Sequence, residues 1–194
     1  MAEIINQNRR CILAATAITL IATQVHAATA DAPARGTNSS FGPLKQVDAG
    51  LLNVGYAEAG PAGGAPVILL HGWPYDIYSF VDVAPVLASA GYRVIVPYLR
   101  GYGTTRFLSN DTFRNAQQAA VALDIIALMD ALKIGKAVIG AFDWGARTAN
   151  IIAALWSERC KGMVSVSGYL IGNPEANRML SPPKGESDAD LFIL

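Results

Sequence analysis

Asp143 is the residue of this chain whose surroundings point most clearly to chemistry. Residues 136–142 read Lys-Ala-Val-Ile-Gly-Ala-Phe, an apolar run typical of a buried strand, and residues 143–152 continue as a helix. Gly145 and Ala146 are small, as a sharp strand-to-helix turn requires where its two elements approach closely. A carboxylate with a pKa of about 4 is ionised at neutral pH and attacks carbon without help from a base. The pattern therefore predicts that Asp143 projects into a cleft as a nucleophile.

Asp143 also has a purely structural interpretation as a helix N-cap, a position that aspartate favours. The sequence Asp-Trp-Gly alone would favour that interpretation. A second motif changes the balance, because residues 66–70, Pro-Val-Ile-Leu-Leu, read as a buried strand that leads directly into His71-Gly72-Trp73-Pro74. The two motifs together favour the nucleophile, and one residue can fill both roles.

In this order the two motifs resemble the α/β-hydrolases that use an aspartate nucleophile, namely epoxide hydrolases and haloalkane dehalogenases. Residues 92–97 are similar to the family's next strand and residues 99–103 to the turn that follows it, with Tyr98 in place of the usual aspartate. The resemblance covers about residues 44–174. It implies an α/β fold with a doubly wound, mostly parallel sheet, ligand chemistry at the carboxyl ends of the strands, and no cofactor.

The resemblance also implies roles for individual residues. Asp143 would displace a leaving group from carbon to form an alkyl-enzyme ester, which water then hydrolyses. The backbone N–H groups of Trp73 and Trp144 would form the oxyanion hole, and their side chains would be apolar walls that bind the substrate. The supporting residues of the loop would be His71, Gly72 and Pro74, the last in the cis form.

The chain offers no histidine base at the position where the family has one. In this fold the base follows the nucleophile, whereas His71 precedes it and is expected to orient the oxyanion loop. The other histidine, His26, lies in the N-terminal segment. The sequence stops soon after an apolar strand at 161–167, before the family's helical cap, last strands and histidine loop. We therefore expect a C-terminally truncated chain that cannot turn over alone, with Glu175 a solvated loop residue.

Three functions stay open at this point. The two motifs are more similar to those of the epoxide hydrolases than to those of the haloalkane dehalogenases, since they read His-Gly-Trp-Pro and Phe-Asp-Trp-Gly-Ala. This resemblance predicts that a small apolar epoxide is the substrate. A haloalkane dehalogenase-like activity is the first alternative, because those enzymes also carry Trp after the nucleophile, as Trp144 does here. A non-catalytic truncated remnant is the second.

Composition excludes several other classes. The chain has 194 residues, 52% of them hydrophobic, and 15 basic against 15 acidic residues give no net charge, so we expect a globular protein without a nucleic-acid partner. No cluster of cysteine and histidine in the sequence could hold zinc. The glycines at 60–65 lack the Lys and Ser/Thr of a phosphate-binding loop.

The N-terminus has the features of a targeting segment. Arg9 and Arg10 precede an apolar run at 11–25, and small residues follow at cleavage-type positions, which predicts a signal peptide over residues 1–27. The run is short against the roughly 20 apolar residues of a spanning helix, so we expect an exported, periplasmic or secreted protein without a stable membrane anchor after cleavage. The twin-arginine and general export routes both stay open.

The remaining chain divides by composition and periodicity. Residues 28–43 read as a flexible lead-in, 44–174 as the N-terminal part of the α/β-hydrolase core, and 175–194 as an irregular tail. Helices are expected over 80–90, over 112–132 and from Asp143 onward. Strands are expected near 45–48, 52–58, 66–70, 92–97, 136–142 and 161–167. In the second helix, residues 121, 125, 128, 129 and 132 are apolar at helical spacing and should face the sheet.

Overall fold

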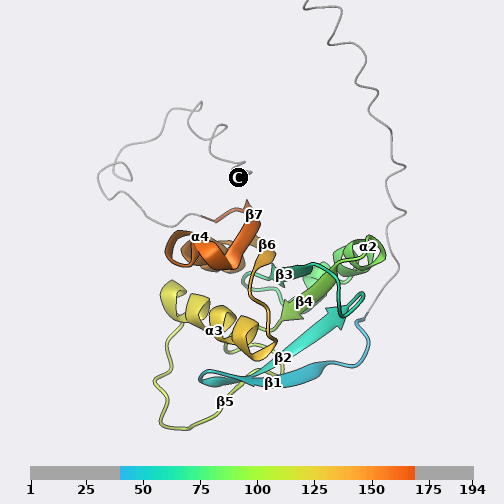
Figure 1. Cartoon of the computed structure of the whole chain (residues 1–194). Coiled ribbons are helices and arrows are strands. Elements are labelled where there is room, and N and C mark those ends of the chain that lie inside the picture. Colours follow the sequence, from blue (N-terminus) through green and yellow to red (C-terminus); the bar gives the residue numbers. More distant parts are fainter. Residues whose placement is uncertain (1–39, 169–194) are drawn as a thin grey trace, which may run out of the picture. The chain divides into compact units, whose positions relative to one another are not determined.

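The computed structural model describes residues 40–168 (Figure 1). The expected signal peptide at 1–27 and tail at 175–194 lie outside the described residues. So do most of the lead-in and the last residues of the predicted core.

The described residues form one mixed sheet with the strand order β1-β2-β4-β3-β6-β7, and β5 pairs with β2 at the side of this path. Strands β4, β3, β6 and β7 run parallel, whereas β1, β2 and β5 are joined by antiparallel pairings. The strands are β1 (Lys45–Ala49), β2 (Leu52–Ala59), β3 (Pro66–Leu70), β4 (Arg93–Pro97), β5 (Arg106–Phe107), β6 (Ala137–Phe142) and β7 (Cys160–Val166).

The strand order places the site. From β3 the chain moves to β4 on one side and later returns to β6 on the other side of β3. The connections that leave β3 and β6 therefore diverge from neighbouring carboxyl ends, which is the place where open α/β sheets bind ligands. The two motifs found in the sequence follow these two strands.

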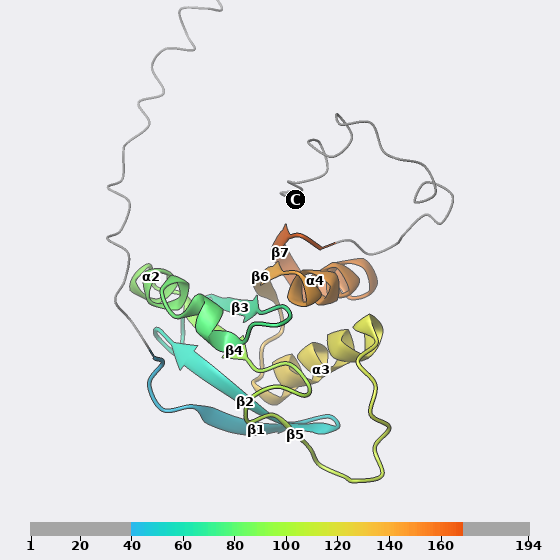
Figure 2. The same cartoon turned by 180° about the vertical axis from the view of Figure 1, so that it is seen from behind.

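Helices cover both faces of the sheet (Figures 1 and 2). Helix α2 (Val83–Ser89) packs against β4 and β2, while α3 (Gln118–Ala131) and α4 (Trp144–Leu155) pack against each other and the opposite face. Two short 3-10 turns complete the described elements, η1 (Ile77–Phe80) and η2 (Ser157–Arg159). Each face has its own buried apolar cluster, the larger one beneath α3 and α4.

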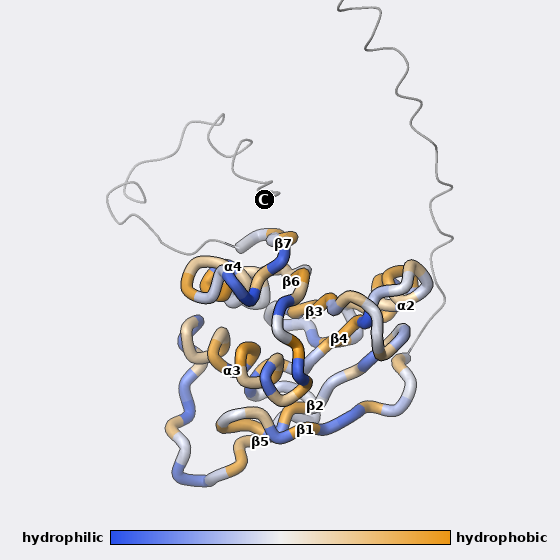
Figure 3. Tube along the Cα trace, in the orientation of Figure 1, coloured by the Kyte–Doolittle hydropathy of each residue, from blue (hydrophilic) through white to orange (hydrophobic). Residues whose placement is uncertain are grey.

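Hydropathy follows this arrangement. The tube in Figure 3 is hydrophobic along β3 and in stretches of α3, and hydrophilic in much of the connection between β5 and α3. Parallel strands with both faces covered are apolar on both faces, as in β3, where Ile68 is buried in the cluster on one face and Leu69 in the cluster on the other. Within residues 40–168 no helix has the length and apolar character that crossing a membrane would need.

Most predicted elements are confirmed, and the errors lie at helix starts. The strands predicted near 45–48, 52–58, 66–70, 92–97, 136–142 and 161–167 are all present within a residue or so. The helix predicted over 80–90 is wrong at its start, because the Asp76 side chain accepts from Tyr78 N at 2.9 Å and caps a separate 3-10 turn, η1. Helix α2 begins only at Val83.

The helix predicted over 112–132 also starts later than expected, at Gln118. The preceding residues are held in an extended connection, in which Gln117 has φ −57° and ψ 140° and the Asn115 carbonyl accepts from Arg100. The predicted sheet-facing residues 121, 125, 128 and 129 are buried, and Leu132 packs at the edge of the same cluster. The short strand β5 was not predicted.

Candidate active site

Asp143 occupies the turn between β6 and α4, in a backbone conformation that few non-glycine residues adopt. Its φ of 50° and ψ of −119° lie in the positive-φ half of conformational space. Such conformations cost energy for an L-residue and persist where the surroundings impose them. Here the Asp143 N–H donates to Val166 O at 2.9 Å, and the Asp143 carbonyl accepts from Arg147 N at 3.0 Å. These main-chain bonds fix the turn from both sides.

The turn is possible because the first turn of α4 lies directly against the end of β3. A Cβ atom placed on Gly145 would lie 2.2 Å from Leu70 O and 2.7 Å from His71 O. No side chain fits in that space, so glycine at this position allows the close approach. Gly145 therefore has the packing role that was predicted for it.

The carboxylate of Asp143 does not cap the helix. It makes no hydrogen bond to the N-terminal N–H groups of α4. Instead its Oδ1 atom accepts from the backbone N–H of Trp73 at 2.9 Å, a contact between residues 70 positions apart. The alternative interpretation of Asp143 as a side-chain cap is therefore wrong in this structure. The side chain is 32% exposed, so it is open to solvent.

The second carboxylate oxygen faces a cation that the sequence analysis missed. Arg147 Nη2 lies 4.0 Å from Asp143 Oδ2, and the guanidinium lies over the Trp144 ring at 5.0 Å from its centroid. Arg147 stands one helical turn after Asp143, so the i, i+4 spacing was a signal that could have identified it. Trp144 itself begins α4, where the first N–H groups have no partner within the helix.

His71 is fully buried and holds the loop that carries Trp73. Its Nε2 atom lies 3.2 Å from Leu99 N, and its Nδ1 atom lies 3.2 Å from Gly72 O. A backbone N–H can only donate, so Nε2 must accept and the proton must be on Nδ1. Burial lowers the pKa of His71 and keeps the ring neutral. His71 and Asp143 share no direct hydrogen bond among those of the described residues.

The loop that follows His71 carries the other predicted supporting residues. A Cβ on Gly72 would lie 2.5 Å from Asp143 Cβ and 2.8 Å from Asp143 Oδ1, so the loop backbone passes directly beside the carboxylate. The Trp73–Pro74 peptide bond is cis. Trp73 is 67% exposed and is not part of the core.

A groove of about 680 Å³ opens beside Phe142, the residue before Asp143. Half of its six lining residues are aromatic, and Tyr75 and Phe142 are in edge contact at 6.2 Å between ring centroids. Asp143 is not among its lining residues, which are Pro74, Tyr75, Asp76, Tyr78, Ser79 and Phe142. The groove therefore adjoins the carboxylate and does not enclose it.

Tyr102 is a further neighbour that the sequence analysis missed. Its ring meets the His71 ring edge-on, with 4.7 Å between centroids. Burial raises the pKa of Tyr102, and the negative charge of Asp143 raises it further, so the phenol stays protonated near neutral pH. Among residues 40–168 no group of three or more His, Cys, Asp or Glu side chains is arranged to hold a metal ion.

The fold and the aspartate turn define the class of protein. The chain belongs to the α/β-hydrolase fold family, whose sequence pattern matches residues 65–194. Within that family it is epoxide hydrolase-like. It is 35% identical over 105 residues to epoxide hydrolase B of Mycobacterium tuberculosis, covering 54% of this chain and 29% of the relative. It is 30% identical over 123 residues to a haloalkane dehalogenase of Mycobacterium marinum, covering 61% of this chain and 39% of the relative.

Solved structures give the same result. A protein from Klebsiella pneumoniae, provisionally named an epoxide hydrolase, is 58% identical and superposes with a TM-score of 0.68, covering 78% of this chain and 50% of that one. An epoxide hydrolase from Vigna radiata is 31% identical with a TM-score of 0.62, covering 69% of this chain and 41% of that one. This chain thus spans half or less of the length of each of these relatives.

Proposed function

We propose that the chain opens small apolar epoxides by nucleophilic attack of Asp143. The observation that supports this most is the hydrogen bond from the Trp73 N–H to Asp143 Oδ1 at 2.9 Å, on a solvent-accessible carboxylate in a strained turn. The bond occupies one oxygen and leaves Oδ2 to attack. The aromatic groove beside Phe142 would accommodate the apolar part of the substrate.

The attack exchanges one carbon–oxygen bond for another. A lone pair on Asp143 Oδ2 forms a bond to one ring carbon, the bond between that carbon and the epoxide oxygen breaks, and its electron pair goes to that oxygen. The alkoxide takes a proton from water, which leaves a hydroxyalkyl ester on Asp143. Oδ1 becomes the ester carbonyl oxygen and stays beside the Trp73 N–H.

Hydrolysis of the ester would use the same donor. Attack of water on the carbonyl carbon places negative charge on Oδ1, and the backbone N–H groups of Trp73 and Trp144 would stabilise that charge as an oxyanion hole. The two histidines of the 194 residues, His26 and His71, both precede Asp143, and His71 has Nε2 directed at Leu99. We therefore expect these 194 residues alone to accumulate the ester and to complete at most one turnover.

Intact-protein mass spectrometry tests the proposal. After incubation with styrene oxide, the full chain should gain the mass of one epoxide, and peptide mapping should place it on Asp143. Asp143→Asn should abolish the gain, whereas Asp82→Asn, a change at an exposed aspartate outside the turn, should leave it intact. Modification that persists in Asp143→Asn, or steady multiple turnover by the wild-type chain, would contradict the proposal.

A haloalkane is the second candidate substrate, supported by the similarity to the Mycobacterium marinum dehalogenase. Incubation with 1-bromobutane distinguishes the two, because a dehalogenase would release bromide in proportion to an alkyl ester on Asp143. The absence of any adduct with either compound would favour a non-catalytic chain.

The proposal includes export of the chain after removal of residues 1–27, based on Arg9, Arg10 and the apolar run that follows them. Fractionation of expressing bacteria, with N-terminal sequencing of the product, tests this. A product that retains Met1 in the cytoplasmic fraction would contradict it.

A further inference from the structure

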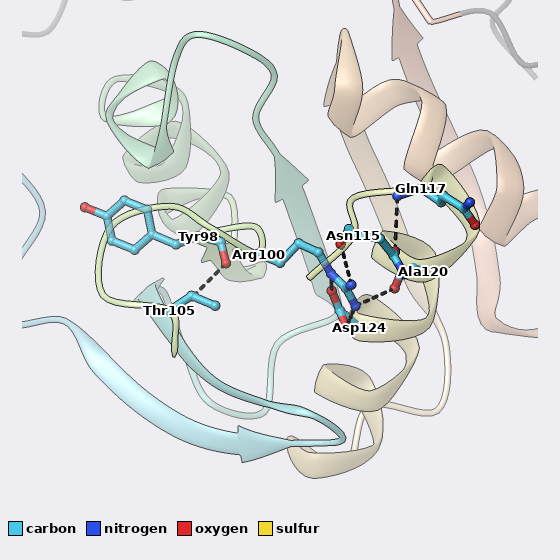
Figure 4. A network of polar contacts seen from close by, with 7 residues as sticks. All are labelled: Tyr98, Arg100, Thr105, Asn115, Gln117, Ala120 and Asp124. Carbon is cyan, nitrogen blue, oxygen red and sulfur yellow. Dashed lines mark hydrogen bonds and ion pairs between the residues drawn. The ribbon is translucent and has the colours of Figure 1, made fainter. Parts of the chain in front are cut away.

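Arg100 is a buried cation that joins the turn after β4 to α3. It lies in the turn after β4, and its guanidinium reaches α3, as Figure 4 shows. Its Nε and Nη2 atoms donate to the two carboxylate oxygens of Asp124 at 2.6 and 2.7 Å. Nη1 donates to Asn115 O at 2.7 Å and Nη2 to Ala120 O at 3.2 Å. Both charged side chains are almost completely buried.

The residues on either side of Arg100 contact His71. The N–H of Leu99 donates to His71 Nε2 at 3.2 Å, and the ring of Tyr102 packs against the His71 ring. Arg100 thus lies between the two residues of this turn that hold the histidine. Its fork of hydrogen bonds to α3 fixes the backbone from which both contacts are made.

The same turn is anchored to the sheet on its other side. Thr105 Oγ1 donates to Tyr98 O at 2.8 Å and accepts from Gly55 N at 3.1 Å, so residues 98–105 are closed against β2. The turn is therefore held at the sheet by Thr105 and at the helix by Arg100. His71, two residues before Trp73, is held in turn by residues 99 and 102.

We infer that Arg100 and Asp124 are positioning residues for the hydrogen-bond donor of the nucleophile. They hold the 98–105 turn against α3, the turn holds the neutral His71 ring, and His71 fixes the loop that directs the Trp73 N–H at Asp143 Oδ1. Every step is a hydrogen bond or ring contact of the described residues, apart from the peptide units that join Arg100 to Leu99 and Tyr102 and those that join His71 to Trp73. The assignment deepens the proposed function and rests on it only for its catalytic consequence.

NMR of the isotope-labelled full chain tests the assignment without activity. The nitrogen shifts of His71 report its tautomer, and the Trp73 amide shift reports the bond to Asp143. In Arg100→Lys the charge stays but the fork is lost, and in Asp124→Asn the shape stays but the charge is lost. Both variants should move the Trp73 amide and His71 nitrogen resonances, and should slow ester formation on Asp143 by about 10- to 100-fold, as a displacement of about 1 Å would.

Arg159 provides a matched control. It likewise pairs with an aspartate and two backbone carbonyls, donating to Asp130 Oδ1 at 2.7 Å and to the carbonyls of Gly135 and Ile134 at 2.8 and 3.1 Å, but it binds one carboxylate oxygen at a more exposed place and fixes the connection between α3 and β6. Arg159→Lys should lower the unfolding temperature, as Arg100→Lys should, yet leave the Trp73 and His71 resonances unchanged. That difference separates positioning from general stabilisation.

The outcomes are distinct. Unchanged Trp73 and His71 resonances in Arg100→Lys and Asp124→Asn would overturn the assignment, as would an equal change in Arg159→Lys. If neither variant folds, the wild-type chain still tests the assignment. The hydrogen bond predicts a scalar coupling between Leu99 N and His71 Nε2, and absence of that coupling would also overturn the assignment. A wild-type chain that shows these resonances but forms no ester would refute the proposed function alone.

Discussion

Gly72→Ala would test the geometry of the site with a single methyl group. The added Cβ would lie 2.5 Å from Asp143 Cβ, 2.8 Å from Asp143 Oδ1 and 3.0 Å from Phe142 O. Carbon atoms in contact normally lie about 3.5 to 4.0 Å apart, so the carboxylate or the loop must move by about 1 Å. The 2.9 Å bond between Trp73 N and Oδ1 would then lengthen or break.

A displacement of about 1 Å lowers the rate of a positioned reaction by about 100-fold. We therefore expect Gly72→Ala to form the Asp143 ester about 100 times more slowly, measured by intact mass against time with styrene oxide. Overpacking should also lower the free energy of unfolding by about 1 to 3 kcal/mol in a urea titration. Gly63→Ala is the matched control, because a Cβ there meets nothing within 4 Å. A wild-type rate of ester formation in Gly72→Ala would refute this geometry.

Three further changes probe the same turn. Gly145→Ala places a Cβ 2.2 Å from the backbone oxygen of Leu70, which cannot rotate away. The free energy of unfolding should therefore fall by about 3 kcal/mol or more. A decrease of less than about 1 kcal/mol would contradict the close approach of α4 to β3. Asp143→Gly removes the cost of a positive φ, so its free energy of unfolding should exceed that of Asp143→Ala by about 1 to 3 kcal/mol, although neither variant should form the ester. Equal stability of the two variants would argue against strain at this position. Burial lowers the pKa of His71 in the folded chain, so the unfolded chain takes up a proton first as the pH falls. The free energy of unfolding should therefore be highest above pH 6.5 and should fall by about 1.4 kcal/mol per pH unit below it. Urea titrations should show that His71→Gln removes this pH dependence.

The parts of this fold that could be predicted are those coded by adjacent residues. The apolar runs before His71 and before Asp143 identify β3 and β6, and the small residues after Asp143 identify a close strand-to-helix turn. Their order along the chain was enough to place both motifs at one edge of the sheet. The contact of Trp73 with Asp143 joins residues 70 apart, so it came from the family resemblance and not from local pattern.

The parts that could not be predicted depend on partners distant in sequence. Arg100 and Asp124 are 24 residues apart, and each taken alone reads as a solvated charge. Their pairing also explains the late start of α3, because the guanidinium binds the Asn115 carbonyl in the extended stretch where a helix was expected. The apolar residues at helical spacing begin only at position 121, so the pattern itself did not support a helix before Gln118.

Tyr98 illustrates why one departure from the family pattern leaves the turn intact. The family's usual aspartate at this position would contribute a polar side chain, yet here the bonds that close the turn come from the Tyr98 main chain, with its N–H donating to Gly55 O at 2.9 Å and its carbonyl accepting from Thr105 Oγ1. The Tyr98 ring is buried beneath Gly103, where a Cβ would lie 2.4 Å from the ring. The side chain at position 98 therefore determines which residue fits at position 103. The contacts to His71 are made by Leu99 and Tyr102, which Arg100 holds in place, and do not depend on residue 98.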